Sequence, residues 1–305
     1  MDPWTVVVGV DHTPEARDAA AFGRRLAEAS GGSWHLITAA ADPLGYTVAT
    51  TAGMDVTALD DAVRDEAWRD AAAALEGLID EDELRHRLRV GLGRPESVIS
   101  QRGDEVNADL YVLGGHHRGR ARSWIHRSTA RHLIRVTDRP VLITGPEGPE
   151  VSRVLAAVDF GVAADPVIQL ADTLAELLDV PLEAAHVVHH PGLPDGREFS
   201  VNIESLMEAE EREAREQLWA HLPDRAGRRI VRGHPTAVLE TLVTETPGAL
   251  LVLGAQGRGW MDRLLIGSTT ESILSALPSA LAVVPARAVP QSRREEVARD
   301  AAGVM

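Results

Sequence analysis

The sequence of 305 residues contains no cysteine and no lysine, because all 31 of its basic residues are arginine. The absence of cysteine excludes disulfides, thiol nucleophiles and cysteine-ligated zinc. The absence of lysine excludes a Walker-A phosphate site, a Schiff-base enzyme and the phosphate-pairing lysine of protein kinases. Any anion site in this chain must therefore rely on backbone N–H groups, hydroxyl groups, histidine or arginine.

Acidic residues outnumber basic ones, 46 to 31, so the net charge is −15. A charge of this sign disfavours nonspecific binding to nucleic acid and to anionic membranes. No apolar run approaches the ~18 residues that a membrane span requires. The start, Met1-Asp2-Pro3-Trp4, carries an acid and lacks the basic segment of a signal peptide. We therefore expect a cytoplasmic protein that has neither nucleic acid nor a membrane as a partner.

Two copies of one unit divide the chain. The run VVVGVD at 6–11 is matched by VLAAVD at 154–159, which lies 148 positions later. Further along, LYVLG at 110–114 is matched by LLVLG at 250–254, which lies 140 positions later. The change of spacing puts a length difference of eight residues between the second and third predicted strands, where loops tolerate it. The chain is therefore a tandem duplication.

Each copy alternates short apolar runs with amphipathic segments. In the first copy, strands are predicted at 6–10, 34–39, 87–91, 110–113 and 141–144. Helices are predicted at 14–30, at 59–78, at 204–222 and after Asp165, with Asp165 as N-cap and Pro166 as the first helical residue. Apolar strands that alternate with helices predict an α/β fold with a parallel sheet covered on both faces.

Prolines and glycines at 145–150 mark the join between the copies. We predict a first domain at 1–145, a linker at 146–152, a second domain at 153–286 and a charged tail at 287–305 that forms a fraying helix or is disordered.

A glycine-rich motif follows the fourth predicted strand of the second copy. Gly254, Gly257, Gly267 and Ser268 form the pattern G-x2-G-x9-G-[ST]. Glycines let backbone N–H groups approach phosphate oxygens, and the helix opening at Ser268 would attract negative charge. A glycine turn alone fits a tight turn with a helix cap equally well. If the strand order is 3-2-1-4-5, however, Asp159 would face this motif where the strand order reverses.

These features resemble the universal stress protein family in its tandem form, over about residues 3–286. The resemblance is carried by Asp159-Phe160, His186-Val187, Gly233-His234-Pro235 and the glycine motif. It implies two tandem doubly wound domains, each a five-stranded parallel sheet of order 3-2-1-4-5 with helices on both faces. It also implies ATP, with or without Mg²⁺, as the ligand. Ala157 and Asp159 would contact the ribose or adenine side, Val187 would pack on adenine, and Gly254, Gln256, Gly257, Gly267, Ser268 and Thr269 would hold ribose and phosphates.

The first copy departs from the motif. Asp11, Gly114 and Ser128 are retained, but His117 and Arg127 stand where the second and third glycines belong. Both replacements put side chains where the backbone should approach phosphate. Either this copy has lost the nucleotide and serves as a scaffold, or Arg127, with Arg118 and His117, supplies charge-assisted contacts to ATP or to a different anion.

By the same resemblance, the last strands of the copies, 141–144 and 281–284, pair with each other, and a homodimer is a further expected assembly. The phosphate loop has no evident general base, so any ATP hydrolysis should be slow and a regulatory, stress-response role is expected. Two alternatives stay open: an interaction scaffold in which nucleotide is structural or absent, and an enzyme of the adenine-nucleotide α-hydrolase type. No metal site is expected, because adjacent histidines such as 116–117 and 189–190 diverge.

Overall fold

The computed structural model describes residues 2–40, 56–115, 125–189, 203–257 and 266–289. The first half contains β1 (Thr5–Gly9), α1 (Glu15–Ser30), β2 (Ser33–Ala40), α3 (Val56–Ala74), α4 (Glu81–Arg87), β3 (Leu88–Leu92), α5 (Pro95–Val106), β4 (Leu110–Leu113), α6 (Ile125–Val136) and β5 (Val141–Ile143). The second half contains β6 (Arg153–Ala157), α7 (Ala164–Leu178), β7 (Leu182–Val188), α8 (Ile203–His221), β8 (Gly227–Arg232), α9 (Pro235–Thr244), β9 (Ala249–Gly254), α10 (Ser268–Ala276), β10 (Ala280–Val284) and the short 3₁₀ helix η1 (Ala286–Ala288). The predicted alternation of strands and helices is confirmed.

The strands predicted for the first half are confirmed to within one residue at each end. The predicted start of α7 is wrong, because the helix begins at Ala164 and contains Asp165 and Pro166 in its first turn. Proline is tolerated there since the first N–H groups of a helix have no partner within it. The extra length of the first half includes α4, which was not predicted and which begins where the Asp80 carboxylate accepts the Glu83 N–H at 2.8 Å.

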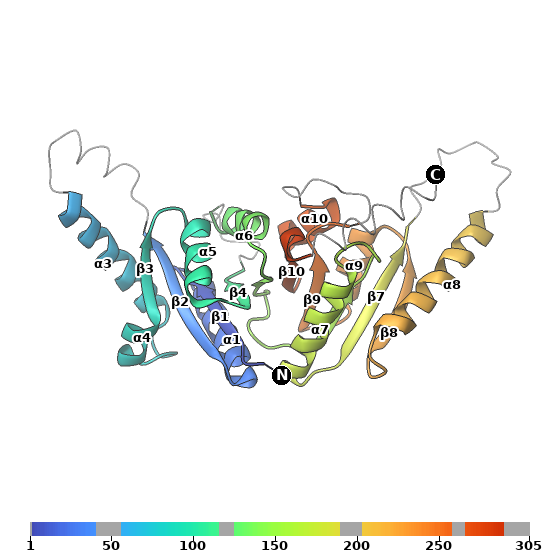
Figure 1. Cartoon of the computed structure of the whole chain (residues 1–305), viewed down its shortest axis with the longest axis horizontal. Coiled ribbons are helices and arrows are strands. Elements are labelled where there is room, and N and C mark those ends of the chain that lie inside the picture. The colour runs from blue at the N-terminus through green and yellow to red at the C-terminus, as the bar shows by residue number, and fades with distance from the viewer. Residues whose placement is uncertain (1, 41–55, 116–124, 190–202, 258–265, 290–305) are drawn as a thin grey trace.

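All ten strands belong to one sheet of order β3-β2-β1-β4-β5-β10-β9-β6-β7-β8. The order 3-2-1-4-5 is confirmed in each half, where neighbouring strands are parallel. The halves meet at β5 and β10, which are antiparallel and place Leu142 opposite Ala282. These two residues hold equivalent positions in the repeat, so a local two-fold axis passes between them. Figure 1 shows the two halves side by side, with the helices on both faces of the sheet.

Two apolar layers, one on each face of the sheet, form the core. Successive strand residues point to opposite faces, so Val6 and Val8 of β1 belong to one layer and Val7 to the other. Helices α1, α3, α7 and α8 pack on the first layer, and α5, α6, α9 and α10 pack on the second. Because each layer contains buried residues of both halves, the core continues across the β5–β10 junction.

The chain beyond β10 begins as packed structure. Val289 follows η1, is 1% exposed and belongs to the first apolar layer. The prediction of a frayed or disordered tail from residue 287 is therefore wrong for 287–289, because the Val289 side chain adds apolar burial. Residues 290–305 lie outside the described part of the chain.

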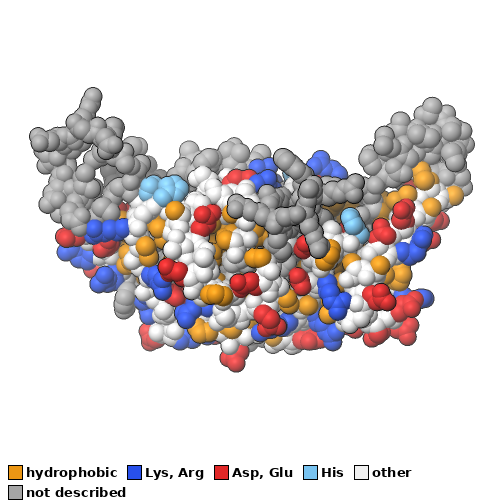
Figure 2. Space-filling view, turned by 180° about the vertical axis from the view of Figure 1, so that it is seen from behind, with side chains coloured by type: hydrophobic (Ala, Val, Ile, Leu, Met, Phe, Trp, Pro, Cys, Tyr) orange, Lys and Arg blue, Asp and Glu red, His pale blue; other side chains and the backbone are white. Residues whose placement is uncertain are grey.

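Arginines on the surface lie among acidic side chains. On the face drawn in Figure 2, basic and acidic side chains are interspersed among the residues that the structure describes. Arg24 contacts Glu28 at 2.7 Å and Arg139 contacts Asp104 at 2.9 Å. No helix within the described ranges is both long and apolar enough to cross a membrane. The expectation that nucleic acid is no partner stays a prediction.

The continuous core gives a test at the junction. Leu142 is fully buried there, so Leu142→Ala should lower the free energy of unfolding by about 2–5 kcal/mol through lost burial and a residual cavity. Val136→Ala is the control, because Val136 is 44% exposed and its truncation should change stability by less than about 0.5 kcal/mol. Urea unfolding followed by circular dichroism measures both. Equal effects of the two variants would contradict the burial of Leu142 at the junction.

Candidate functional site

A cavity of about 430 Å³ opens at the carboxyl ends of β6 and β9. These parallel strands are neighbours, and the chain leaves them on opposite sides, so the cavity lies where the strand order reverses. All nine residues that the sequence indicated line this cavity: Ala157, Asp159, Val187, Gly254, Gln256, Gly257, Gly267, Ser268 and Thr269. The structure thus brings together residues that lie up to 112 positions apart in the chain.

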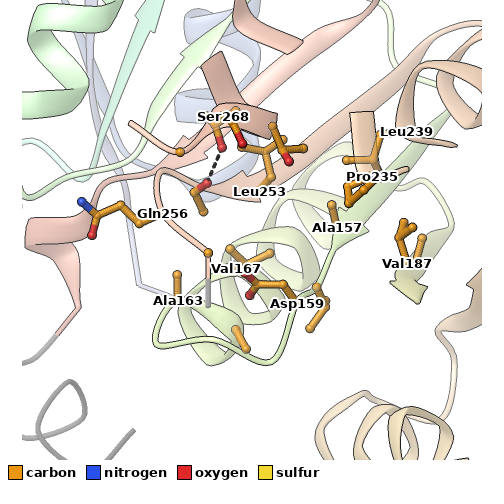
Figure 3. A pocket seen from close by; sticks show the side chains of 18 of the residues that line it. Ala157, Asp159, Ala163, Val167, Val187, Pro235, Leu239, Leu253, Gln256 and Ser268 are labelled. Atoms are coloured by element: carbon orange, nitrogen blue, oxygen red, sulfur yellow. Dashed lines mark hydrogen bonds between the residues drawn. The ribbon is translucent and has the colours of Figure 1, made fainter. Parts of the chain in front are cut away.

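One side of the cavity is apolar. Ala157, Val187, Pro235 and Leu239 come from β6, β7 and α9, and Figure 3 shows them together on one side. Ser268 lies apart from Val187 in the same view, toward the start of α10. The cavity therefore offers an apolar surface at one end and polar groups at the other, which is the usual composition of a small-molecule site.

The polar end is built around the first turn of α10. Gly267 is the N-cap residue and donates its N–H to the Ala255 carbonyl at 2.8 Å. The buried Thr270 hydroxyl donates to the Gly254 carbonyl at 2.8 Å, which ties the helix to the end of β9. Ser268 is exposed to the cavity, and the N–H groups at the start of the helix favour an anion.

Asp159 lies between the turn after β6 and the glycine turn after β9. Its Oδ1 accepts the Gly161 N–H at 2.9 Å, which holds the turn after β6. Its Oδ2 lies so close to Gly257 that a Cβ atom at that glycine would stand 2.6 Å away. A side chain at position 257 would therefore require the Asp159 carboxylate to shift.

One wall of the cavity was not predicted from the sequence, and one predicted side chain points elsewhere than expected. Ala163, Ala164 and Val167 of α7 and the turn before it line the cavity and were not predicted. Comparison of the copies could have found Ala163, because the equivalent residue of the first half is the larger Glu15. Gln256 lines the cavity, but Figure 3 shows its amide directed away from Asp159 and Ser268, so its backbone is what faces the polar end.

The equivalent crevice of the first half has a different lining. Gly9 stands where the second half has Ala157, and a Cβ atom at Gly9 would lie 2.7 Å from Leu113 Cδ2 and 2.9 Å from Ile99 Cδ1. Glu15, with a buried Oε2, stands where the second half has Ala163. The first half thus carries a larger, acidic side chain at one position that lines the cavity of the second half.

The other first-half candidates are only partly described. Asp11 accepts the Thr13 N–H at 2.8 Å and the Thr13 hydroxyl at 2.6 Å. Ser128 is the fourth residue of α6, whereas Ser268 is the first residue of α10, so the two helices begin at different points of the repeat. His117 and the side chain of Arg127 lie outside the described residues.

Two histidines meet at the mouth of the cavity. His189 lines it, and its ring packs edge-on against His234 with the ring centroids 5.1 Å apart. Within the described segments no three or more His, Cys, Asp and Glu side chains are grouped as metal ligands. His190 and His116 lie outside these segments.

Comparison with known proteins identifies relatives of both halves. The model of the universal stress protein family matches residues 5–145 and 150–285. Universal stress protein A homolog 1 of Coxiella burnetii is 30% identical over 126 residues, which cover 40% of this chain and 87% of that protein. A universal stress protein structure from Archaeoglobus fulgidus has a TM-score of 0.58 at 16% identity and covers 93% of this chain and 97% of its own. A Pseudomonas aeruginosa structure, described as a putative universal stress protein, has a TM-score of 0.60 at 17% identity, with 96% and 97% covered. The two structural likenesses show a shared fold.

The bond between α10 and β9 gives a test that needs no ligand. Thr270→Val keeps the volume but removes the buried hydroxyl, so the free energy of unfolding should fall by roughly 1–3 kcal/mol. Thr241→Val is the matched control, because its hydroxyl bonds the Ala237 carbonyl on an exposed helix surface and should matter by less than about 0.5 kcal/mol. Urea unfolding compares them. Loss of equal size in both variants would show that the Thr270 hydroxyl does not hold the helix.

Proposed function

The chain belongs to the universal stress protein family, and from this premise we propose that its second half binds an adenine nucleotide, ATP, with or without Mg²⁺. One observation carries the proposal: the nine indicated residues, drawn from four separate segments, line a single cavity of about 430 Å³. These segments are the residues after β6, the end of β7, the glycine turn after β9 and the start of α10. Their placement around one cavity is not expected by chance.

The chemistry of the cavity matches the parts of ATP. The purine would pack on the apolar surface that includes Val187 and Leu239. Asp159, an acceptor when ionised, suits ribose hydroxyl groups. The phosphates would lie at the polar end, where Gly257 and Ser268 present backbone N–H groups and a hydroxyl.

Binding is favoured over efficient catalysis. The chain has no lysine to stabilise phosphoryl transfer, and the described cavity lining holds one carboxylate, Asp159, which is engaged with the Gly161 N–H. A bound nucleotide would act by stabilising one conformation over another, which suits a regulatory role in a stress response with at most slow hydrolysis. Cytoplasmic localisation stays a prediction from the sequence.

An interaction scaffold is the second candidate, favoured by the continuous sheet and core that join the halves. We propose that the β5–β10 pairing persists in solution, with domains at 1–145 and 153–286 joined by residues 146–152. In the scaffold alternative the nucleotide would be structural or absent, and a homodimer would extend the assembly.

A serine pair at equivalent positions provides the test of ATP binding. Ser268→Ala removes a hydroxyl from the phosphate end of the proposed site, and hydrogen bonds to charged groups are worth ~1.5–3 kcal/mol, so the Kd for ATP should rise about tenfold or more. Ser128→Ala makes the same change in the half without an intact glycine motif and should leave the Kd unaltered. Isothermal titration calorimetry measures both. Absence of ATP binding to the parent protein, with no nucleotide released from denatured protein in mass spectrometry, would favour the scaffold.

The changed lining of the first half leads to a second expectation. Because that half lacks the second and third glycines of the motif and has Glu15 in place of Ala163, we expect one ATP per chain. The stoichiometry from calorimetry should be close to one and unchanged in Asp11→Ala. Two sites per chain, or loss of one site in that variant, would show that the first half binds nucleotide through a changed set of contacts.

A further inference from the structure

An ion pair links the first half to the helix that borders the proposed phosphate site. Helices α6 and α10 are equivalent elements of the two halves and lie on either side of the β5–β10 junction (Figure 1). Arg131 of α6 places one guanidinium nitrogen, Nη2, 2.6 Å from Glu271 Oε1 and 2.7 Å from Ser275 Oγ. The Ser275 hydroxyl donates in turn to the Glu271 carbonyl at 2.7 Å. A single side chain of the first half therefore contacts two successive turns of α10.

The pair joins unlike residues at equivalent positions. Arg131 and Glu271 are 140 positions apart, which is the repeat spacing of this region. Across a two-fold axis between identical halves, this position would face its own copy, and like charges would meet. Divergence of the two halves removes that conflict, since the arginine of one half meets the acid of the other.

Glu271 occupies a position where a negative charge would oppose phosphate. It lies in the first turn of α10, whose first residues, Ser268 and Thr269, line the polar end of the cavity. Anions compete for the positive potential of a helix N-terminus, so an uncompensated carboxylate here would weaken the attraction for a phosphate group. The side chains of Arg131 and Glu271 are 28% and 38% exposed, so water screens them less than it screens a fully exposed pair.

Buried atoms of the Arg131–Glu271 ion pair make each charge depend on the other. Glu271 Oε2 and Arg131 Nε are both buried and have no hydrogen-bond partner among the residues that the structure describes. Loss of either charged group would leave the other partly buried and uncompensated.

We infer that Arg131 is a positioning residue through which the half without an intact glycine motif sets the ATP affinity of the other half. It acts by neutralising Glu271 beside the phosphate end of the cavity. The inference rests on the proposed function, since it concerns the same site. Because the effect is electrostatic, it grows with the charge of the ligand, from adenosine to AMP to ATP.

The test uses the full chain and three ligands of different charge. In Arg131→Gln, the Kd for ATP should rise about three- to tenfold, as Coulomb interaction of one charge with several phosphate charges at roughly 10 Å suggests. The Kd for AMP should rise less, and the Kd for adenosine should stay unchanged. Added salt should shrink the ATP effect, and Arg131→Lys, which keeps the charge, should bind ATP as the parent does.

Removing the carboxylate of Glu271 shows whether Arg131 acts through its charge or by holding α10 in place. The double variant Arg131→Gln, Glu271→Gln should recover the parent affinity for ATP, because no carboxylate is left to repel phosphate. Glu271→Gln alone should bind ATP more tightly, and thermal unfolding checks that each variant is folded. Three results would overturn the inference even if the parent protein binds ATP. They are an unchanged ATP affinity in Arg131→Gln, an equal loss of affinity for adenosine and ATP, and an ATP affinity of the double variant that stays below that of the parent. A parent protein that binds no ATP would overturn the proposed function and this inference together.

Discussion

The antiparallel pairing of β5 with β10 is the interaction on which the rest of the molecule depends. It places Leu142 opposite Ala282 on a local two-fold axis and turns two five-stranded sets into one sheet. Both apolar layers contain buried residues of the two halves, so the core continues across the junction. The same pairing brings α6 beside α10, which allows Arg131 to reach Glu271. The junction thereby connects the half with the altered glycine motif to the half with the intact one.

Duplication followed by divergence explains why the two crevices differ. Both halves repeat the strand order that leaves a crevice between their first and fourth strands. In the second half, small residues such as Ala163 and Gly257 leave that space open, and the backbone remains accessible. In the first half, Glu15 stands where the second half has Ala163, and Ile99 and Leu113 pack closely around Gly9.

Local patterns predicted the elements well and their ends less well. Apolar runs placed the first-half strands to within one residue, since a buried parallel strand needs an unbroken apolar run. The start of α7 was wrong because a proline fits any of several first-turn positions, and the preference for Pro166 at the first position was not decisive. Helix α4 was not predicted because its seven residues are mostly charged and show no apolar periodicity, although Asp80 before it is a suitable N-cap residue.

The sequence by itself determined the duplication and the parallel α/β class, because strand burial and repeat offsets are properties of short segments. Its resemblance to the universal stress protein family supplied the set of nine residues that line one cavity. Only the tertiary structure decided that Gln256 directs its amide away from Asp159 and Ser268, that α7 forms a cavity wall, and that Arg131 contacts Glu271. Those outcomes depend on how layers far apart in the chain pack together, and no short segment contains the geometry of that packing.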